Sequence, residues 1–143
     1  MTRDEIVAAA RGWIGTPYRH QASLKGVGAD CLGLVRGLWR DLIGPEPEAV
    51  PAYSPDWAEA GGRETLAAGG LRHMIAVPIE AAQPGDVVLY RFREGLPAKH
   101  AGLLVTADRM VHATERIGVV EVALGPWWRR RIAYAFAFPG IDT

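Results

Sequence analysis

The sequence predicts an α+β domain in which helices come first and an antiparallel sheet follows. Its first half carries apolar residues at helical spacing, whereas its second half is a series of short runs rich in β-branched and aromatic residues. The change falls at Gln83-Pro84-Gly85, a typical turn sequence. Helices followed by strands along the chain are typical of α+β domains. With 143 residues, the chain is expected to form one domain over residues 1–143, long enough to bury its own core.

Two helices are predicted in the first 45 residues. Thr2 and Glu5 fit a capping box, and Gly15-Thr16-Pro17 ends the helix that they start. Asp30 is the expected N-cap of the second helix, which ends at Gly44-Pro45. The apolar stripe of this second helix consists of Leu34, Val35, Leu38, Trp39 and Leu42.

The remaining segments are a loop, a middle third without clear periodicity, and five strands. Residues 18–29 are rich in glycine and polar side chains and are predicted to be an irregular loop. Residues 45–78 begin with several prolines, and residues 57–74 are predicted to hold one or two short helices interrupted by the paired glycines at 61–62 and 69–70. The expected strands are Asp86–Phe92, His100–Val105, Arg109–Thr114, Val119–Leu124 and Ile132–Phe138.

The composition argues against several classes of function. Lys plus Arg and Asp plus Glu balance at 16 each, so we expect neither a nucleic-acid partner nor an anionic membrane surface. No apolar stretch is long enough to span a bilayer. The N-terminal residues 1–5 are typical of a helix start and not of a signal peptide, because no apolar core region follows them. We therefore expect synthesis in the cytoplasm, where a reducing environment suits a single free cysteine.

The single cysteine, Cys31, directly follows Asp30 in the first turn of the second predicted helix. Backbone N–H groups and the positive end of the helix dipole favour the thiolate at such a position. Because a lone cysteine cannot form an internal disulfide, Cys31 is a packing residue, a metal ligand or a nucleophile. A nucleophilic thiol needs an imidazole as its base and a third polar group to orient that base. His100 and His112, in adjacent predicted strands, are the candidates for these two roles.

The two histidines meet only if the hairpin between them has a particular register. Both positions are even, so the two rings share a face only if paired residue numbers sum to an even value. That requires an odd loop or a bulge near residues 106–108, whereas a plain two-residue turn would place the rings on opposite faces. A zinc site made by Cys31, His100 and His112, with or without His20, is an alternative use of the same side chains, although paired-ligand spacing is missing.

Five short blocks follow one another along the chain. They are Gly15-Thr16-Pro17-Tyr18, Asp30-Cys31-Leu32-Gly33-Leu34-Val35, Gly85-Asp86-Val87-Val88, His100-Ala101-Gly102-Leu103 and Met110-Val111-His112-Ala113. In order and spacing these blocks resemble the NlpC-type family of papain-like cysteine peptidases, which are bacterial cell-wall endopeptidases. The resemblance implies a papain-like α+β fold, with N-terminal helices packed on a five- to six-stranded antiparallel sheet. It also implies cleavage of peptidoglycan stem peptides, typically next to the γ-linked D-glutamate, without a cofactor or metal.

The resemblance assigns roles to individual positions. Cys31 matches the nucleophile, His100 the general base and His112 the third, orienting residue. Tyr18 matches a tyrosine whose hydroxyl lies near the oxyanion and the substrate, and Asp30 matches a residue that shapes the substrate end of the site. Simpler roles stay open for these last two residues, as a packing side chain and a helix cap.

The chain also departs from the family pattern. Leu32 stands where relatives usually have serine, and His20-Gln21-Ala22 stands where many have Trp-Gly-Gly. The form of the Cys31 block, together with His20-Gln21, is most similar to the phage-tail and gene-transfer-agent branch. The resemblance therefore implies a component of a phage-like tail, with tail proteins as partners, that opens the wall for DNA entry from the periplasm of the target cell. A catalytically silent tail-hub protein of the same fold is the alternative, as is amidase or acyl-transfer chemistry at the same site.

Overall fold

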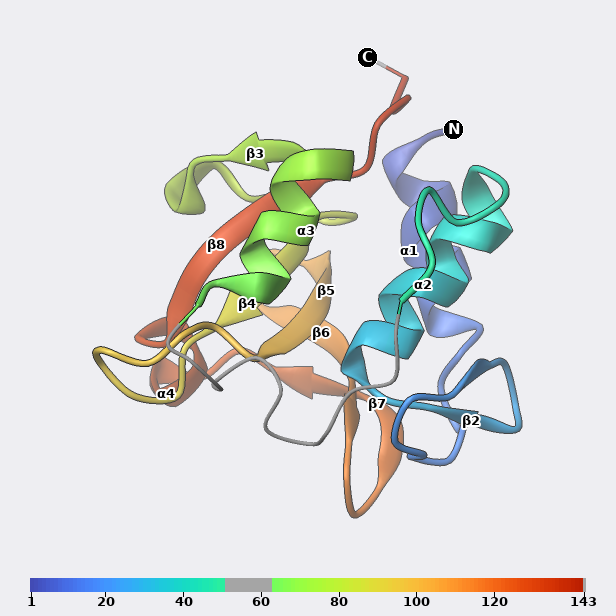
Figure 1. Cartoon of the computed structure of the whole chain (residues 1–143), viewed down its shortest axis with the longest axis horizontal. Helices are drawn as coiled ribbons and strands as arrows, with labels where there is room; N and C mark the ends of the chain where they lie inside the picture. The colour runs from blue at the N-terminus through green and yellow to red at the C-terminus, as the bar shows by residue number, and fades with distance from the viewer. Residues whose placement is uncertain (51–62, 143) are drawn as a thin grey trace.

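The computed structural model describes residues 1–50 and 63–142, and the chain forms two layers of helix and sheet (Figure 1). The sheet has six strands in the order β3-β8-β4-β5-β6-β7, and every neighbouring pair is antiparallel. The strands are β3 (Ile75–Val77), β4 (Val87–Tyr90), β5 (His100–Thr106), β6 (Arg109–Thr114), β7 (Gly118–Ala123) and β8 (Ile132–Ala137). The α+β class and the five expected strands are thereby confirmed.

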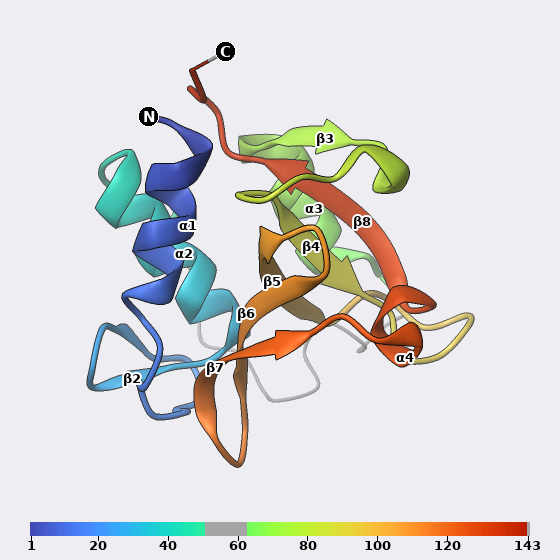
Figure 2. The same cartoon turned by 180° about the vertical axis from the view of Figure 1, so that it is seen from behind.

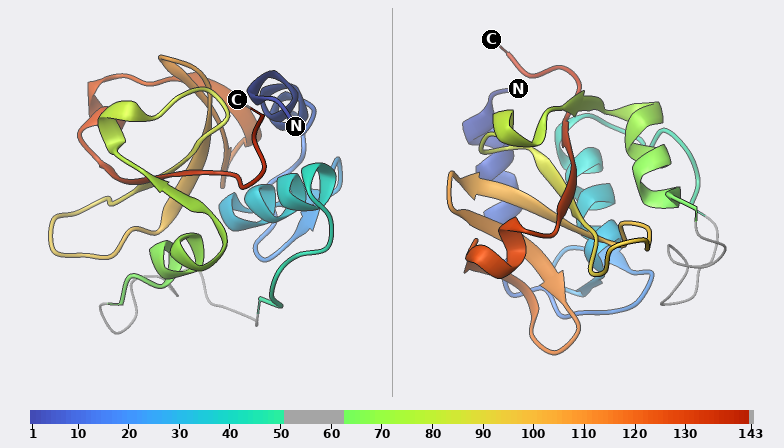
Figure 3. Two further views of the ribbon diagram at one scale, coloured as in Figure 1. Left: turned by 90° about the horizontal axis from the view of Figure 1, so that it is seen from above. Right: turned by 90° about the vertical axis from the view of Figure 1, so that its left-hand side faces the viewer.

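The connectivity of the sheet differs from a simple meander. Strands β4 to β7 follow one another as hairpins, but β8 returns across the sheet to pair with β4. The edge strand β3, which pairs with β8, lies in the segment for which no strand was expected. A short 3-10 helix, η2 (Ile79–Ala81), joins β3 to β4, and the four-residue helix α4 (Pro126–Arg129) joins β7 to β8. The sheet is strongly curved when it is seen from above (Figure 3).

Helices α1 (Arg3–Arg11) and α2 (Cys31–Leu42) pack against each other and against β5 (Figure 2). The predicted caps are confirmed: the Thr2 hydroxyl accepts the Glu5 N–H at 3.1 Å, and the Asp30 carboxylate accepts the Gly33 N–H at 2.7 Å. In the expected stripe of α2, Leu34 and Leu38 are buried, and Val35, Trp39 and Leu42 are partly buried against the core.

Helix α3 (Thr65–His73) covers β4 and β8 and runs through the glycine pair at 69–70 (Figure 1). The predicted interruption at that pair is therefore wrong. A Cβ at Gly70 would lie 2.7 Å from the Phe136 ring, so glycine here serves close packing of α3 on the sheet. The part of the helix prediction that falls on residues 57–62 lies outside the described residues.

The loop over residues 18–29 contains a small antiparallel hairpin that was not expected, formed by β1 (Ser23–Leu24) and β2 (Gly28–Ala29). This hairpin lies against the first turn of α2. A Cβ at Gly33 would be only 1.8 Å from the Ala22 carbonyl oxygen, and the Ser23 hydroxyl donates to the Gly33 carbonyl at 2.6 Å. No described helix has the length and apolar content of a membrane span.

Candidate functional site

Cys31 is the first residue of α2, and its sulfur lies against the start of β5. The sulfur is 3.8 Å from the Lys99 carbonyl oxygen, and the backbone N–H of Ala101 forms a hydrogen bond to it. These two groups belong to the residues on either side of His100. The packing of α2 on β5 thus brings the only cysteine of the chain to the main chain of His100.

The hairpin between β5 and β6 has the register that lets the two histidines meet. Leu103 pairs with Val111, but Thr106 pairs with Arg109, because the register shifts between residues 104 and 106. Beyond this bulge the paired numbers sum to an even value, so the bulge predicted near residues 106–108 is confirmed. His100 Nε2 lies 2.9 Å from His112 Nδ1, within hydrogen-bond distance.

This hydrogen bond determines which nitrogen of His100 can serve the thiol. Nε2 points to His112, which leaves Nδ1 as the ring nitrogen on the main-chain side of His100. The Cys31 sulfur contacts the Lys99 carbonyl oxygen, in the peptide group that precedes His100. If Nε2–H donates to His112, Nδ1 is unprotonated and acts as an acceptor. The arrangement suits the order thiol, base and orienting residue, while the catalytic roles themselves stay predictions.

Aromatic rings surround the two histidines. The Trp128 ring stacks on His100 at a centroid distance of 5.7 Å and 29°, and meets the His112 ring edge-on at 5.2 Å. Phe92 also stacks on His100 at 5.7 Å, and Tyr90 lies 6.1 Å away. Sequence reasoning missed these neighbours, because Trp128 belongs to α4 and reaches the site only through the return of β8 to β4.

Burial keeps both imidazoles neutral. It lowers the pKa of His100 to about 3, with further contributions from the charges of His112 and Lys99. Burial likewise lowers the pKa of His112 to about 4. At pH 7 both rings are therefore uncharged, so His100 can accept a second proton and is not an imidazolium at rest.

The electrostatics of Cys31 differ from the expectation of a thiolate. Burial, followed by the negative charge of Asp30, raises the pKa of the thiol to about 11. Backbone N–H groups of Ala101, Leu32 and Cys31 itself lower this pKa, as a helix N-terminus should, but they are outweighed. The prediction of a thiolate at rest is therefore wrong, and the site holds a neutral thiol beside a neutral imidazole.

Tyr18 and Asp30 both lie beside Cys31. Tyr18 forms a parallel bridge with Ala29, and burial, Asp30 and Cys31 together raise its pKa to about 12. Its hydroxyl is therefore a permanent donor at neutral pH. The buried Asp30 carboxylate accepts the N–H groups of Gly33 at 2.7 Å and Gln21 at 2.8 Å, with His20 Nδ1 at 3.8 Å. The N-cap role of Asp30 is confirmed, and substrate roles for both residues stay predictions.

Metal-binding geometry was searched across residues 1–50 and 63–142. Within these ranges, no three His, Cys, Asp or Glu side chains are grouped as a metal site would require.

Comparisons with known proteins agree with this geometry. The model of the NlpC/P60 family matches residues 15–135. The murein DD-endopeptidase MepS/murein LD-carboxypeptidase of Escherichia coli (strain K12) is 30% identical over 130 residues, which cover 90% of this chain and 59% of that protein. The γ-D-glutamyl-L-lysine dipeptidyl-peptidase of Bacillus subtilis (strain 168) is 24% identical over 122 residues, 85% of this chain and 35% of that protein. This chain therefore spans less than two thirds of the length of either relative.

Solved structures share the fold. The NlpC/P60 domain of the peptidoglycan hydrolase SagA superposes with a TM-score of 0.64 and 21% identity, covering 96% of this chain and all of that one. At this level of identity the likeness establishes the fold alone. It confirms the expected papain-like arrangement of N-terminal helices on a six-stranded antiparallel sheet.

Proposed function

The chain belongs to the NlpC/P60 family, and we propose on that basis that it is a cysteine endopeptidase acting on the stem peptides of peptidoglycan. One observation carries the proposal: the Cys31 sulfur contacts the Lys99 carbonyl and the Ala101 N–H, on either side of His100, and the His100 ring is hydrogen-bonded to His112. The names of the relatives support the substrate class, because they describe hydrolysis of murein and of a γ-D-glutamyl-L-lysine bond.

The first half of the proposed reaction forms a thioester. His100 Nδ1 accepts the thiol proton while the Cys31 sulfur attacks the carbonyl carbon of the substrate amide. The new imidazolium donates from Nε2 to His112 and lies against the Trp128 ring, which attracts a cation. The backbone N–H of Cys31 and the Tyr18 hydroxyl donate to the oxyanion.

The second half releases the products and restores the site. His100 gives its proton to the amine as the carbon–nitrogen bond breaks, and the acyl group remains on sulfur. A water molecule then attacks the thioester and gives its proton to His100. The bond to sulfur breaks, the sulfur takes that proton back, and a free carboxyl group leaves.

The proposal is tested by digestion of purified muropeptides, with mass analysis of the fragments. We expect Cys31→Ala to lower cleavage by about 10⁴-fold or more, since a covalent mechanism fails without its nucleophile. Arg116→Gln, in the exposed turn after β6, is the control and should cleave like the parent protein. Cleavage that survives in the folded Cys31→Ala variant would contradict the proposal.

We further propose that the protein is made in the cytoplasm, is built into a phage-like tail and acts in the periplasm of the target cell. Two sequence features support this part of the proposal: the block around Cys31 reads Asp-Cys-Leu-Gly-Leu-Val, and His20-Gln21 comes shortly after Tyr18. Purified particles from the producing cells, probed with an antibody to the chain, should contain it with tail proteins. Its recovery solely as a free cellular protein would refute the tail assignment and leave the peptidase proposal intact.

A further inference from the structure

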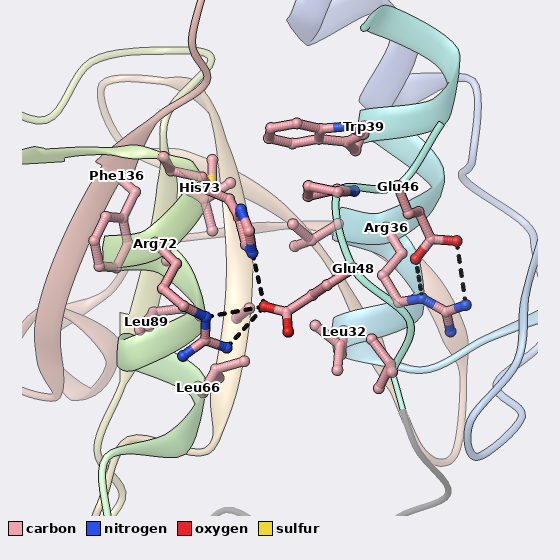
Figure 4. A pocket seen from close by; sticks show the side chains of 18 of the residues that line it. Leu32, Arg36, Trp39, Glu46, Glu48, Leu66, Arg72, His73, Leu89 and Phe136 are labelled. Carbon is pink, nitrogen blue, oxygen red and sulfur yellow. Dashed lines mark hydrogen bonds and ion pairs between the residues drawn. The ribbon is translucent and has the colours of Figure 1, made fainter. Parts of the chain in front are cut away.

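A cavity of about 260 Å³ lies between α2 and α3, directly beside the candidate active site. The sheet forms its floor, α2 and α3 flank it, and residues 46–50 line it beside α2 (Figure 4). Its apolar lining includes Leu32, Val35, Trp39, Leu66, Leu89 and Phe136. An apolar cavity of about 150 Å³ holds a benzene molecule, so this one has room for roughly ten non-hydrogen atoms of an aliphatic group.

Two residues that line the cavity also contact the nucleophile. Leu32 and Ala101 both line it, and the backbone N–H groups of these two residues face the Cys31 sulfur. A group attached near an amide carbonyl at Cys31 therefore has a short path into the cavity. This position favours a part of the substrate over an unrelated ligand.

A carboxylate of the chain itself occupies the charged rim of the cavity. Arg72 Nε and Nη2 lie 3.0 and 2.8 Å from Glu48 Oε1, and His73 Nε2 lies 2.7 Å from the same oxygen (Figure 4). Both Arg72 and Glu48 are about half exposed, with side-chain exposures of 55% and 46%. Exposed ion pairs contribute little to stability, so another carboxylate can replace Glu48 at small cost. A guanidinium and an imidazole together are well suited to hold it.

We propose that this cavity binds an aliphatic side chain ending in a carboxylate, on a residue next to the amide that Cys31 attacks. The methylene groups occupy the apolar interior, and the carboxylate displaces Glu48 from Arg72 and His73. The identity of this ligand as part of the substrate rests on the peptidase function proposed above. The cavity and its charge preference rest on the geometry alone.

Binding of n-octanoate to the whole chain, measured by calorimetry, tests the site without requiring cleavage. We expect octanoate to bind at least tenfold more tightly than n-octylamine. Arg72→Gln should weaken octanoate at least tenfold, and Glu48→Gln should strengthen it, because the competing carboxylate is gone. A merely structural role for Glu48 predicts no gain. Arg116→Gln, an exposed arginine in the turn after β6, is the matched control and should leave binding unchanged.

Variants that fill the cavity test whether the alkyl group of octanoate binds inside it. A Cβ at Gly69 on α3 meets nothing closer than 3.8 Å, so Gly69→Leu can extend into the space, and Val35→Phe fills it from α2. Either variant, once shown to be folded, should abolish octanoate binding. No measurable binding by the parent chain, or binding that is unchanged in both filled variants and in Arg72→Gln, would overturn the proposal.

Cleavage of paired peptides links the cavity to the substrate. A peptide with 2-aminosuberate beside the scissile amide should have a kcat/KM at least fivefold above that of the norleucine peptide, and Arg72→Gln should remove the difference. Equal cleavage of both peptides, abolished by Cys31→Ala, would overturn the substrate assignment while the peptidase function stands. Octanoate binding with the expected variant pattern but no cleavage of any peptide would instead refute the peptidase function.

Discussion

Gly33→Ala tests whether the loop before Cys31 packs on α2 as closely as the structure shows. The added methyl carbon would lie 1.8 Å from the Ala22 carbonyl oxygen, where ordinary contact begins at 3.4 Å. Backbone atoms cannot rotate away as a side chain can, so the loop must move by more than 1 Å. The Ala22 carbonyl also accepts the Asp30 N–H, and the Asp30 carboxylate accepts the Gln21 N–H, so the same movement strains the cap of α2.

The expected cost combines overpacking with weakened hydrogen bonds. Overpacking typically costs about 1–3 kcal/mol, and each impaired hydrogen bond adds about 1 kcal/mol. We therefore expect Gly33→Ala to lower the free energy of unfolding by about 3 kcal/mol or more. For a domain of this size, that corresponds to a fall in Tm of roughly 6–12 °C.

Urea and thermal unfolding followed by circular dichroism measure this difference. Gly69→Ala is the matched control, because it makes the same change inside a helix where the nearest neighbouring atom is 3.8 Å from the new carbon. This control should be neutral or more stable by about 0.5–1 kcal/mol, since alanine is the better helix former. A Gly33→Ala variant within 0.5 kcal/mol of the parent protein would show that the close approach does not exist in solution.

Three further predictions concern the electrostatics of the site. The rate of Cys31 alkylation by iodoacetamide should be low at pH 7 and rise toward pH 11. Asp30→Asn should raise this rate about three- to tenfold at pH 8, because a nearby negative charge is removed. A rate that is already maximal at pH 7 would contradict the raised pKa of Cys31. Trp128→Leu exposes His100, so the pKa of this ring should rise toward 6.5, and the pKa of the acid limb of the kcat/KM profile should rise with it. An acid limb that stays unchanged in pH–rate profiles would contradict the role of Trp128 in keeping His100 buried. The free energy of unfolding should be greatest between about pH 6.5 and 9 and fall on both sides, as urea titrations at a series of pH values can measure.

Local features of the site were predictable because nearby residues determine them. Thr2 and Asp30 cap their helices as their positions indicated, and the bulge between β5 and β6 satisfies the parity condition set by His100 and His112. Each of these depends on a few consecutive residues or on one hairpin. The assignment of Cys31 to the start of a helix followed from the same kind of local signal.

Features that depend on contacts between distant segments were not predictable. The return of β8 to β4 brings Trp128 onto His100, although nothing in the local sequence pattern around α4 indicates that partner. The cavity beside Cys31 exists because α2 and α3 cover separate parts of one sheet. The prediction of a thiolate at Cys31 was wrong for a related reason. The dipole of α2 can be expected from sequence, but the burial that outweighs its effect on the pKa arises from packing on β5.

The two neutral partners of the site destabilise the fold at opposite ends of the pH range. The pKa of His100 is about 3 in the folded chain and 6.5 ordinarily, so below pH 6.5 the unfolded chain binds more protons and stability falls. For His100 alone the loss at pH 4.5 is about 2–3 kcal/mol, which His100→Gln should largely abolish. The pKa of Cys31 is about 11 instead of 9.0, so above pH 9 the unfolded chain releases its proton first and stability falls again. A thiolate–imidazolium pair at rest would reverse both signs, because Cys31 would then have a lowered pKa and His100 a raised one. The direction of the two limbs therefore distinguishes a neutral pair from an ion pair without any substrate.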